Sequence, residues 1–204
     1  MLGAAGLIAA AAITPGPNNL VVMRVAMHAG FIGALPAIAG ILAGGLVMLL
    51  LVVAGAGVLF AAVPRLHHVI TVGGGAYLCW LGARLVMDSF AKSSAQGAAG
   101  HALPSDAAAL FGFQFLNPKS WVMVLTVTSA VRAGTEASQV FLPLAVLFTL
   151  IPALCLALWS ALGALMTTWL HRPRVRNWMD RVMGVLLLVS ALLLVLAPVD
   201  APLP

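Results

Sequence analysis

The sequence consists of long apolar segments separated by short polar ones. Apolar residues dominate the following segments, given approximately: 2–27, 31–63, 69–86, 105–131, 141–170 and 181–197. A helix needs about 20 consecutive apolar residues to cross a bilayer, and most of these segments are about that long or longer. They are too continuous for the alternating strands of an outer-membrane barrel. The pattern therefore predicts an all-α integral membrane protein with six transmembrane helices.

Helix-breaking residues interrupt the first and the fourth predicted span. The first contains Thr-Pro-Gly-Pro-Asn-Asn at residues 14–19, and the fourth contains Asn-Pro-Lys at residues 117–119. A break in a membrane helix frees backbone N–H and C=O groups, which need partners because lipid offers none. Either neighbouring helices repair such a break or the unwound turn binds a substrate near the bilayer midplane. The breaks alone leave both explanations open.

The two halves of the chain show the same order of spans: broken, long, ordinary. Corresponding features are offset by roughly 100 to 115 residues, which is a weak internal repeat. Residues 91–104, rich in Ala, Ser and Gly, form a linker near the centre. We therefore expect a first three-helix repeat in residues 1–90, a cytoplasmic linker in 91–104 and a second three-helix repeat in 105–204. Because each half has an odd number of spans, the repeats are expected to be inverted.

Three local features refine the first half. Pro36 predicts a kink in the long second span. Gly40 and Gly44, one helical turn apart, indicate close helix packing. Residues 64–68 are expected to form a polar connection before the third span. Their adjacent histidines, His67 and His68, point to different sides and have no carboxylate or Cys nearby, so we predict no metal site there.

Composition supports the membrane class and argues against others. The chain is 63% hydrophobic and only 7% charged, whereas soluble domains average roughly 25% charged residues. The pI of about 10.3 could suggest a nucleic-acid partner. However, the basic residues are scattered singly between apolar spans and form no basic face. We therefore expect contact with membrane lipid and no nucleic-acid binding.

The positions of the basic residues indicate the orientation. With six spans, the first, third and fifth connections lie on one side of the membrane and carry seven of the ten basic residues. Arg65 and Arg132 lie on the other side. The positive-inside rule then places the seven in the cytoplasm and both termini outside it. Lys119 belongs to neither side.

Lys119 is the most informative charge in the sequence. At mid-membrane a cation costs on the order of 2.5 to 3.5 kcal/mol on insertion scales, which argues for a function. Asn117 resembles an N-cap, and Pro118 suits the first position of a new helix. Gly16-Pro17, or Thr14-Pro15, can start a helix in the same way. Alternatively, Lys119 only bonds the carbonyls freed by Pro118, or it meets water in a re-entrant segment.

In inverted repeats both new helix N-termini would point inward, and together with Lys119 they suit a carboxylate. Nearby amide oxygens could bind an ammonium group, although each amide could equally be a capping group. No Asp or Glu is expected at this depth, which favours neutral amino acids. The predicted substrate-binding residues are Thr14, Pro15, Gly16, Pro17, Asn18, Asn19, Gln114, Asn117, Pro118 and Lys119.

These motifs resemble the LysE/RhtB family of bacterial amino-acid exporters. The resemblance rests on Thr-Pro-Gly-Pro-Asn at residues 14–18, on Gly112 with Leu-Asn-Pro-Lys at 116–119, and on Arg181 with Gly184. It implies a multi-pass protein of the bacterial inner membrane that exports amino acids or close derivatives, driven by the proton gradient. Family members export threonine, homoserine, leucine, cysteine derivatives, lysine or arginine. The resemblance is compatible with a homo-oligomer, and it implies neither enzymatic activity nor a cofactor.

Proton coupling would need an acidic group. Asp88 and Asp180, near the cytoplasmic ends of the third and sixth spans, are the candidates. All acidic residues are expected at the interface or in loops. A salt-bridged role, for instance of Asp180 with Arg176, is the alternative to proton coupling.

Three other classes compete with an exporter. An intramembrane thiol redox protein would need a Cys beside each break, but neither break has one, and we expect Cys79 and Cys155 to be small buried hydrophobes. A metal-efflux protein would cluster His, Asp or Cys, but the histidines are dispersed. A non-transporting scaffold would leave Lys119 without a purpose.

Overall fold

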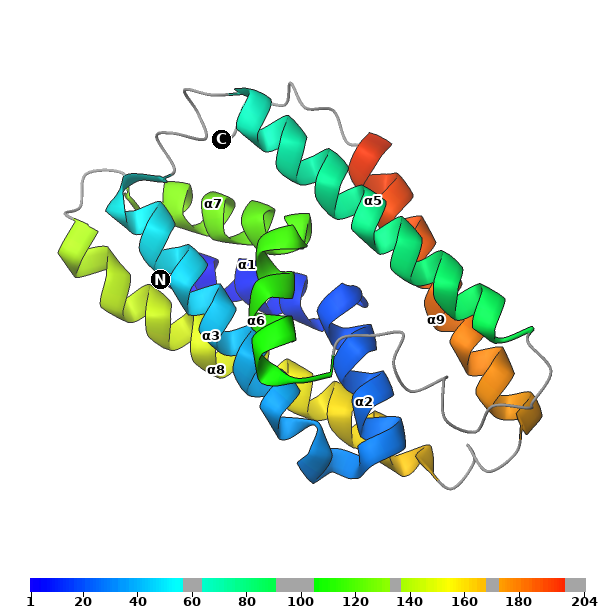
Figure 1. The fold of residues 1–204 in the computed structure, drawn as a ribbon. Helices are drawn as coiled ribbons and strands as arrows, with labels where there is room; N and C mark the ends of the chain where they lie inside the picture. Colours follow the sequence, from blue (N-terminus) through cyan, green and yellow to red (C-terminus); the bar gives the residue numbers. More distant parts are fainter. Residues whose placement is uncertain (57–63, 91–104, 133–136, 168–172, 197–204) are drawn as a thin grey trace.

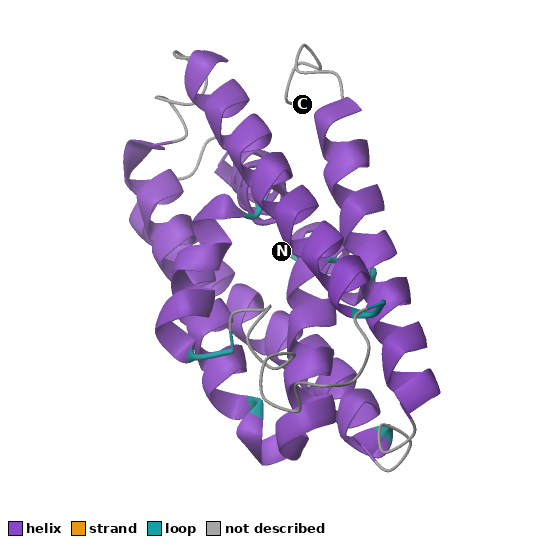
Figure 2. Cartoon of the chain, turned by 45° about the vertical axis from the view of Figure 1, so that its right-hand side comes forward, coloured by secondary structure: helices purple, strands orange, loops and turns teal. Residues whose placement is uncertain are grey.

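The computed structural model describes residues 1–56, 64–90, 105–132, 137–167 and 173–196. The predicted linker 91–104 lies outside these ranges. Within them the chain is helical and contains no strand, as Figure 2 shows, so the all-α prediction is confirmed. In chain order the elements are α1 (Leu2–Ile13), α2 (Pro17–Gly33), α3 (Leu35–Leu51), the π-helix η1 (Val52–Ala56), α5 (Pro64–Asp88), α6 (Ala107–Leu116), α7 (Pro118–Arg132), α8 (Ala137–Leu165) and α9 (Pro173–Leu196).

Both predicted breaks are present. The axes of α1 and α2 are bent by 52° across the first break. There Gly16 is extended (φ −154°, ψ 175°) and Pro17 opens α2, so the chain uses the Gly16-Pro17 start. Between α6 and α7, Asn117 is extended (φ −93°, ψ 101°) and Pro118 opens α7. Proline suits a first helical position because its missing N–H would have no partner there.

Three boundaries differ from the sequence-based expectations. Pro36 lies in the first turn of α3, so it starts that helix and does not kink a longer one. Residues 64–68, predicted as a polar connection, are the first residues of α5, where Pro64 is tolerated for the same reason. Helix α9 begins at Pro173, well before residue 181. In each case a proline was taken for a kink or a loop residue although it begins a helix.

The helices pack in pairs that are distant in sequence (Figure 1). α5 and α9 lie side by side along one side of the molecule, α2 packs against α8, and α3 packs against α6. Glycines allow these close approaches. A Cβ added to Gly44 of α3 would lie 2.8 Å from the Phe111 carbonyl oxygen of α6, and one added to Gly40 would lie even closer to the backbone of Ala107. The predicted packing role of these two glycines is confirmed.

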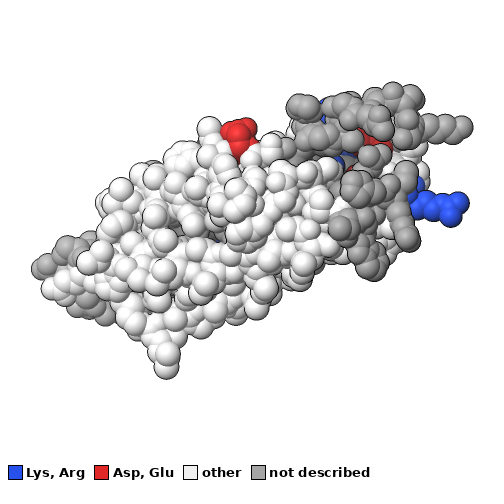
Figure 3. Space-filling view, turned by 90° about the horizontal axis from the view of Figure 1, so that it is seen from below, with Lys and Arg blue, Asp and Glu red and all other residues white. Residues whose placement is uncertain are grey.

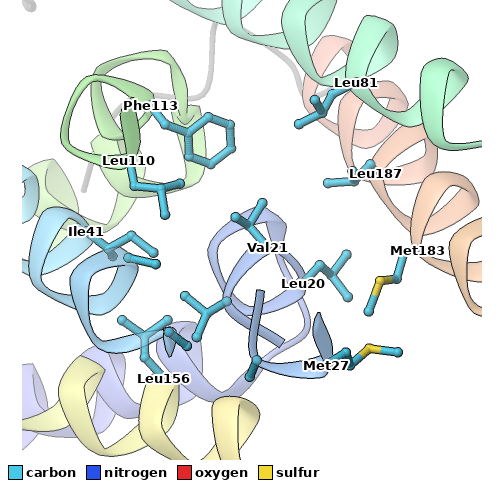
Figure 4. Close-up of a cluster of buried hydrophobic side chains, with 14 of the residues drawn as sticks. Leu20, Val21, Met27, Ile41, Leu81, Leu110, Phe113, Leu156, Met183 and Leu187 are labelled. Carbon is cyan, nitrogen blue, oxygen red and sulfur yellow. The ribbon is translucent and has the colours of Figure 1, made fainter. Parts of the chain in front are cut away.

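The buried apolar side chains form two clusters. One joins α2 to the α5–α9 pair and to α6, and Figure 4 shows Leu20 and Val21 of α2 between Leu110 of α6 and Leu187 of α9. The other joins α1, α3, α7 and α8, with Phe148 of α8 among its members. Both clusters border the breaks, so the two helix starts are held within a packed interior.

The outer surface is that of a membrane protein. On α8 the side chains of residues 142, 146, 150, 154, 158 and 162 are large, apolar and exposed. They are four residues apart and form a stripe of roughly 30 Å at 1.5 Å per residue, about the thickness of the hydrocarbon core. Figure 3 agrees, since few charged atoms appear on the visible face.

Among the described residues, two helices are long and apolar enough to span a membrane, Leu35–Gly55 and Gln139–Leu165. A third span results if α1 and α2 are one broken span. The six-span arrangement of two inverted repeats stays a prediction.

The expectation for the cysteines was wrong for Cys79. Both cysteines are free, but Cys79 is exposed on α5, and Cys155 on α8 is partly exposed. A small apolar residue in a membrane helix can face lipid as readily as protein, so an apolar neighbourhood in sequence does not imply burial.

Candidate functional site

The two helix starts meet at one cavity of about 50 Å³. The first break contributes Gly16, Pro17, Asn18 and Asn19 to its lining, and the second contributes Asn117, Lys119 and Ser120. Helices α1, α3, α7 and α8 complete it with Ala11, Ala12, Ile41, Met123, Pro152 and Leu156. Helix N-termini carry partial positive charge from their free N–H groups, so two of these ends and a lysine meet in one place.

Lys119 reaches from α7 to the first break. Its Nζ donates to the Thr14 hydroxyl at 2.8 Å and to the Thr14 carbonyl at 3.1 Å. The side chain passes over Gly16, where an added Cβ would lie 2.9 Å from Nζ. The Thr14 hydroxyl in turn donates to the Ala11 carbonyl at 2.9 Å. In the described part of the chain no carboxylate forms an ion pair with Lys119.

A chain of amide hydrogen bonds ties the two breaks together. Asn117 Nδ2 donates to Asn18 Oδ1 at 3.0 Å, and Asn18 Nδ2 donates to Gln114 Oε1 at 3.3 Å. Gln114 Nε2 donates to the Ile41 carbonyl at 3.2 Å, which extends the chain to α3. Both Gln114 and Asn117 are only 2% exposed. Buried amides need such partners, so this network fixes the relative positions of α2, α6 and α7.

Ser120 is a member of the network that the sequence reasoning missed. Its hydroxyl donates to Gln114 Oε1 at 2.6 Å, and it also lines the cavity. Its position directly after Lys119, in the first turn of a helix that starts at a break, was the only signal. One turn of helix from Asn117 brings its hydroxyl back to the amides.

The remaining amide groups cap the broken helix ends. Asn117 Oδ1 accepts from the Lys119 backbone N–H at 3.2 Å, so the predicted N-cap is confirmed. Asn19 Nδ2 donates to the carbonyls of Ala12 at 2.8 Å and Thr14 at 3.0 Å, groups that the end of α1 leaves without helical partners. Both breaks are thus repaired by side chains that lie inside them.

The predicted binding residues therefore gather in one region, but not all of them face the cavity. Six line it: Gly16, Pro17, Asn18, Asn19, Asn117 and Lys119. Thr14 bonds to Lys119, and Gln114 lies behind the lining and bonds to Asn18. Pro118 lies against α5 at Gly74, and Pro15 is exposed.

The two acidic candidates lie elsewhere. Asp88 is exposed near the end of α5. Asp180 is buried in α9, and its Oδ1 lies 3.3 Å from Arg24 Nη2 of α2, with the two side chains 9% and 6% exposed. Asp180 lies within α9 and not in a loop, because α9 starts earlier than predicted; an interfacial depth for Asp180 stays a prediction. Arg24, which the sequence reasoning used only for topology, is a partner of Asp180. The side chain of Arg176, suggested from the sequence, lies outside the described residues.

Comparisons with known proteins agree on one family. A family model described as LysE type translocator matches residues 9–197. The chain is 30% identical over 158 residues to cysteine/O-acetylserine efflux proteins of Salmonella choleraesuis strain SC-B67 and Salmonella typhimurium strain LT2, covering 76% of this chain and 77% of each relative. The protein of the same name from Escherichia coli strain K12 is 29% identical over the same coverage. No solved structure matches.

Proposed function

Because the chain belongs to the LysE type translocator family, we propose that it is a secondary active transporter that exports neutral amino acids or close derivatives from the cytoplasm. Members of this family are membrane transporters and not enzymes. Cysteine and O-acetylserine, which appear in the names of the relatives, are small and neutral in their side chains and are the first candidates. The apolar stripe on α8 would face lipid.

One observation carries the proposal: Lys119 lies beside a cavity at which two helix N-termini converge. The ammonium group is held by oxygen atoms of Thr14, and no described carboxylate neutralises it. A substrate carboxylate would supply the missing negative charge and accept hydrogen bonds from Lys119 and from the first turn of α2, whose N-terminus has no side-chain cap. The broken helices thus provide the geometry by which transporters bind carboxylates at mid-membrane.

The charge of the lining favours a neutral side chain. None of the described lining residues is Asp or Glu, so a second cationic group on the substrate would have no counter-charge. The α-ammonium group is different, because amide and carbonyl oxygens at the breaks can accept its hydrogen bonds. Lysine and arginine would therefore be poor substrates, since burying an unpaired charge is strongly unfavourable.

The amides at the breaks have a supporting role in this proposal. Asn18, Gln114 and Asn117 bond to one another, and Asn19 bonds to carbonyls of the first break. Lys119 and the two helix starts would make the main contacts with the carboxylate. The network would hold these groups at the correct separation, and a substrate would compete for few of its bonds.

The proposed topology has six spans in two inverted three-helix repeats, residues 1–90 and 105–204, with both termini outside the cytoplasm of a bacterial inner membrane. Two contacts support it. Arg24 of α2 meets Asp180 of α9, and Arg181 of α9 donates to Ser89 of α5 at 3.1 Å. The proposed cytoplasmic ends of the first, third and sixth spans therefore lie together.

For energy coupling we favour proton antiport through Asp180. Asp180 is buried and pairs with Arg24, so its negative charge helps to hold α9 against α2. Helix α2 begins at the cavity, so a shift of α2 would reach the binding site. Protonation of Asp180 would remove one partner of a buried ion pair and so favour separation of the two helices. Asp88 is exposed and is therefore the weaker candidate.

Export from loaded cells tests the proposal. Bacteria that lack their own amino-acid exporters are loaded with single amino acids as dipeptides, and release is compared between wild-type protein, an empty vector and Lys119→Ala at matched membrane abundance. Lys92→Ala, at the other lysine of the sequence, is the control. We expect wild type and Lys92→Ala to release a neutral amino acid well above the vector, and Lys119→Ala to lose at least nine-tenths of that release. Equal release by Lys119→Ala would contradict the proposed site.

A further inference from the structure

The cavity lining has polar and apolar members. Lys119, Asn18 and Ser120 are polar, and Met123, Ile41 and Leu156 are apolar residues that we call the apolar wall. A carboxylate bound at Lys119 would direct the rest of an amino acid along the cavity. The side chain of the substrate would then meet the apolar wall.

Met123 is the residue of this wall that stands next to Lys119. The two are four residues apart in α7, so their side chains lie on the same face of the helix, with Cβ atoms about 5–6 Å apart. Helix α8 also contributes to the lining, with Pro152 and Leu156, which are four residues apart.

The wall residues differ in how freely they can adjust. Ile41 and Leu156 are 3% and 2% exposed and belong to the larger buried apolar cluster, so their neighbours hold them in place. Met123 is only partly buried. Its unbranched, flexible side chain can take several shapes at little cost, which makes it the movable part of the wall.

The cavity is small. Its volume is about 50 Å³. A cavity must offer about 10–15 Å³ to hold one water molecule, so this one has room for only a few. A binding site that fits its substrate closely discriminates one methylene group by roughly 10- to 200-fold. An apolar lining residue therefore has a large effect on which side chains the cavity accepts.

We propose that Met123 sets the upper limit on substrate side-chain size, so that the protein selects small uncharged amino acids over large apolar ones. This inference rests on the proposed export function and on a carboxylate bound at Lys119. Truncating Met123 would extend the cavity along α7 and admit longer side chains. Truncating Ile41 or Leu156 would instead open a hole in the packed interior and destabilise the protein.

The test compares export of alanine and leucine from cells loaded with the corresponding dipeptides. Wild type, Met123→Ala and Met87→Ala are expressed at matched membrane abundance. Met87 is an exposed methionine of α5 and serves as the control. We expect Met123→Ala to raise the leucine-to-alanine ratio of initial export rates at least fivefold. Met87→Ala should leave the ratio unchanged.

A second substitution guards against loss of folding. Met123→Leu nearly preserves volume and should keep a ratio within about twofold of wild type. If Met123→Ala does not reach the membrane, Met123→Val is used, and a rise of at least twofold is expected. A ratio unchanged in the truncated variant would overturn the role of Met123 while leaving export established. Absence of export of alanine, leucine and cysteine alike by wild type, by contrast, would contradict the proposed function itself.

Discussion

Lys119 is bound by oxygen atoms of Thr14, and no carboxylate in the described ranges pairs with it. A lysine paired with an acid inside the protein would already be neutralised, and a substrate would have to displace that acid. Uncharged oxygen acceptors orient the ammonium group while leaving its charge available. This arrangement is the reason why a carboxylate is the ligand that we propose.

Thr14 is expected to position Lys119. Thr14→Val removes the hydroxyl that accepts from Nζ at 2.8 Å but keeps the backbone carbonyl. Hydrogen bonds to charged groups contribute about 1.5–3 kcal/mol, and about 1.4 kcal/mol is a factor of ten, so we expect the initial export rate to fall about ten- to a hundredfold. Thr14→Ser keeps the hydroxyl and should retain most of the rate. Equal rates for valine and threonine at this position would show that the hydroxyl has no part in transport.

Gln114 is expected to matter for stability. Gln114→Leu removes the hydrogen-bond partner of the half-buried Asn18 amide and of the buried Ser120 hydroxyl and Ile41 carbonyl. Each unsatisfied group costs about 1–3 kcal/mol, so the midpoint of thermal unfolding in detergent should fall by several degrees. Gln139→Leu, at an exposed position of α8, is the matched control and should unfold near the wild-type temperature. Similar midpoints for the two variants would argue against the network.

At the scale of helices, local chemistry made the breaks predictable from sequence. Proline disrupts a helix interior but can begin a helix, and Asn before proline can cap it. Residues 14–19 and 117–119 therefore predict the end of one helix and the start of the next. The same rule explains the errors at Pro36 and Pro64, which begin helices and were read as a kink and a loop. Proline alone does not say whether a helix ends or starts there.

Close packing of α3 on α6 leads to a prediction at the same scale. A Cβ at Gly40 would clash with the backbone of Ala107, whereas a Cβ at Gly45 of the same helix would meet nothing within 4 Å. Gly40→Ala should therefore lower the thermal unfolding midpoint. Gly45→Ala should raise it slightly or leave it unchanged, because alanine favours helix by up to about 1 kcal/mol over glycine. The same change in both variants would contradict the packing.

The Arg24–Asp180 pair gives a prediction for the contact between α2 and α9. Asp180→Asn removes the carboxylate charge that faces Arg24, whose side chain is only 6% exposed, and breaking a buried ion pair costs about 3–5 kcal/mol. We expect a marked loss of thermal stability. Asp88→Asn, at an exposed site, should have little effect.

The double variant Arg24→Met/Asp180→Leu distinguishes the effect of the ion pair from the effect of side-chain packing between α2 and α9. Apolar replacements of a buried pair are often neutral or stabilising, so the double variant should be more stable than Asp180→Asn alone. A double variant as unstable as the single one would show that the ion pair is not what joins these helices.

The arrangement of the whole molecule was less predictable than its parts. The α5–α9 pair joins the rest through apolar contacts such as Leu20 of α2 with the cluster that contains Leu187. These contacts join residues far apart in sequence, and hydropathy carries no information about which helices meet. The sequence did indicate that Lys119 lies near the first break. It did not reveal the contacts of Ser120 or the Arg24–Asp180 pair, because these also join residues that are distant in sequence or lie on different helices.

The proposed topology predicts the location of the chain ends. Alkaline phosphatase fused after Leu196, at the end of α9, should be active, because that enzyme folds only outside the cytoplasm. Green fluorescent protein fused at the same position should be dark. A fluorescent fusion together with an inactive phosphatase would place the end of α9 in the cytoplasm and so contradict the proposed orientation.

Counterflow in liposomes tests the account's central claim, that Lys119 binds the carboxylate of an exported amino acid. Purified wild-type, Lys119→Ala and Lys92→Ala proteins are reconstituted with the neutral amino acid that cells release, and uptake of labelled substrate is followed with and without the corresponding amino-acid amide. We predict counterflow by wild type and Lys92→Ala, none by Lys119→Ala, and no competition from the amide, which lacks a carboxylate. Undiminished counterflow by Lys119→Ala, or full competition by the amide, would contradict the claim.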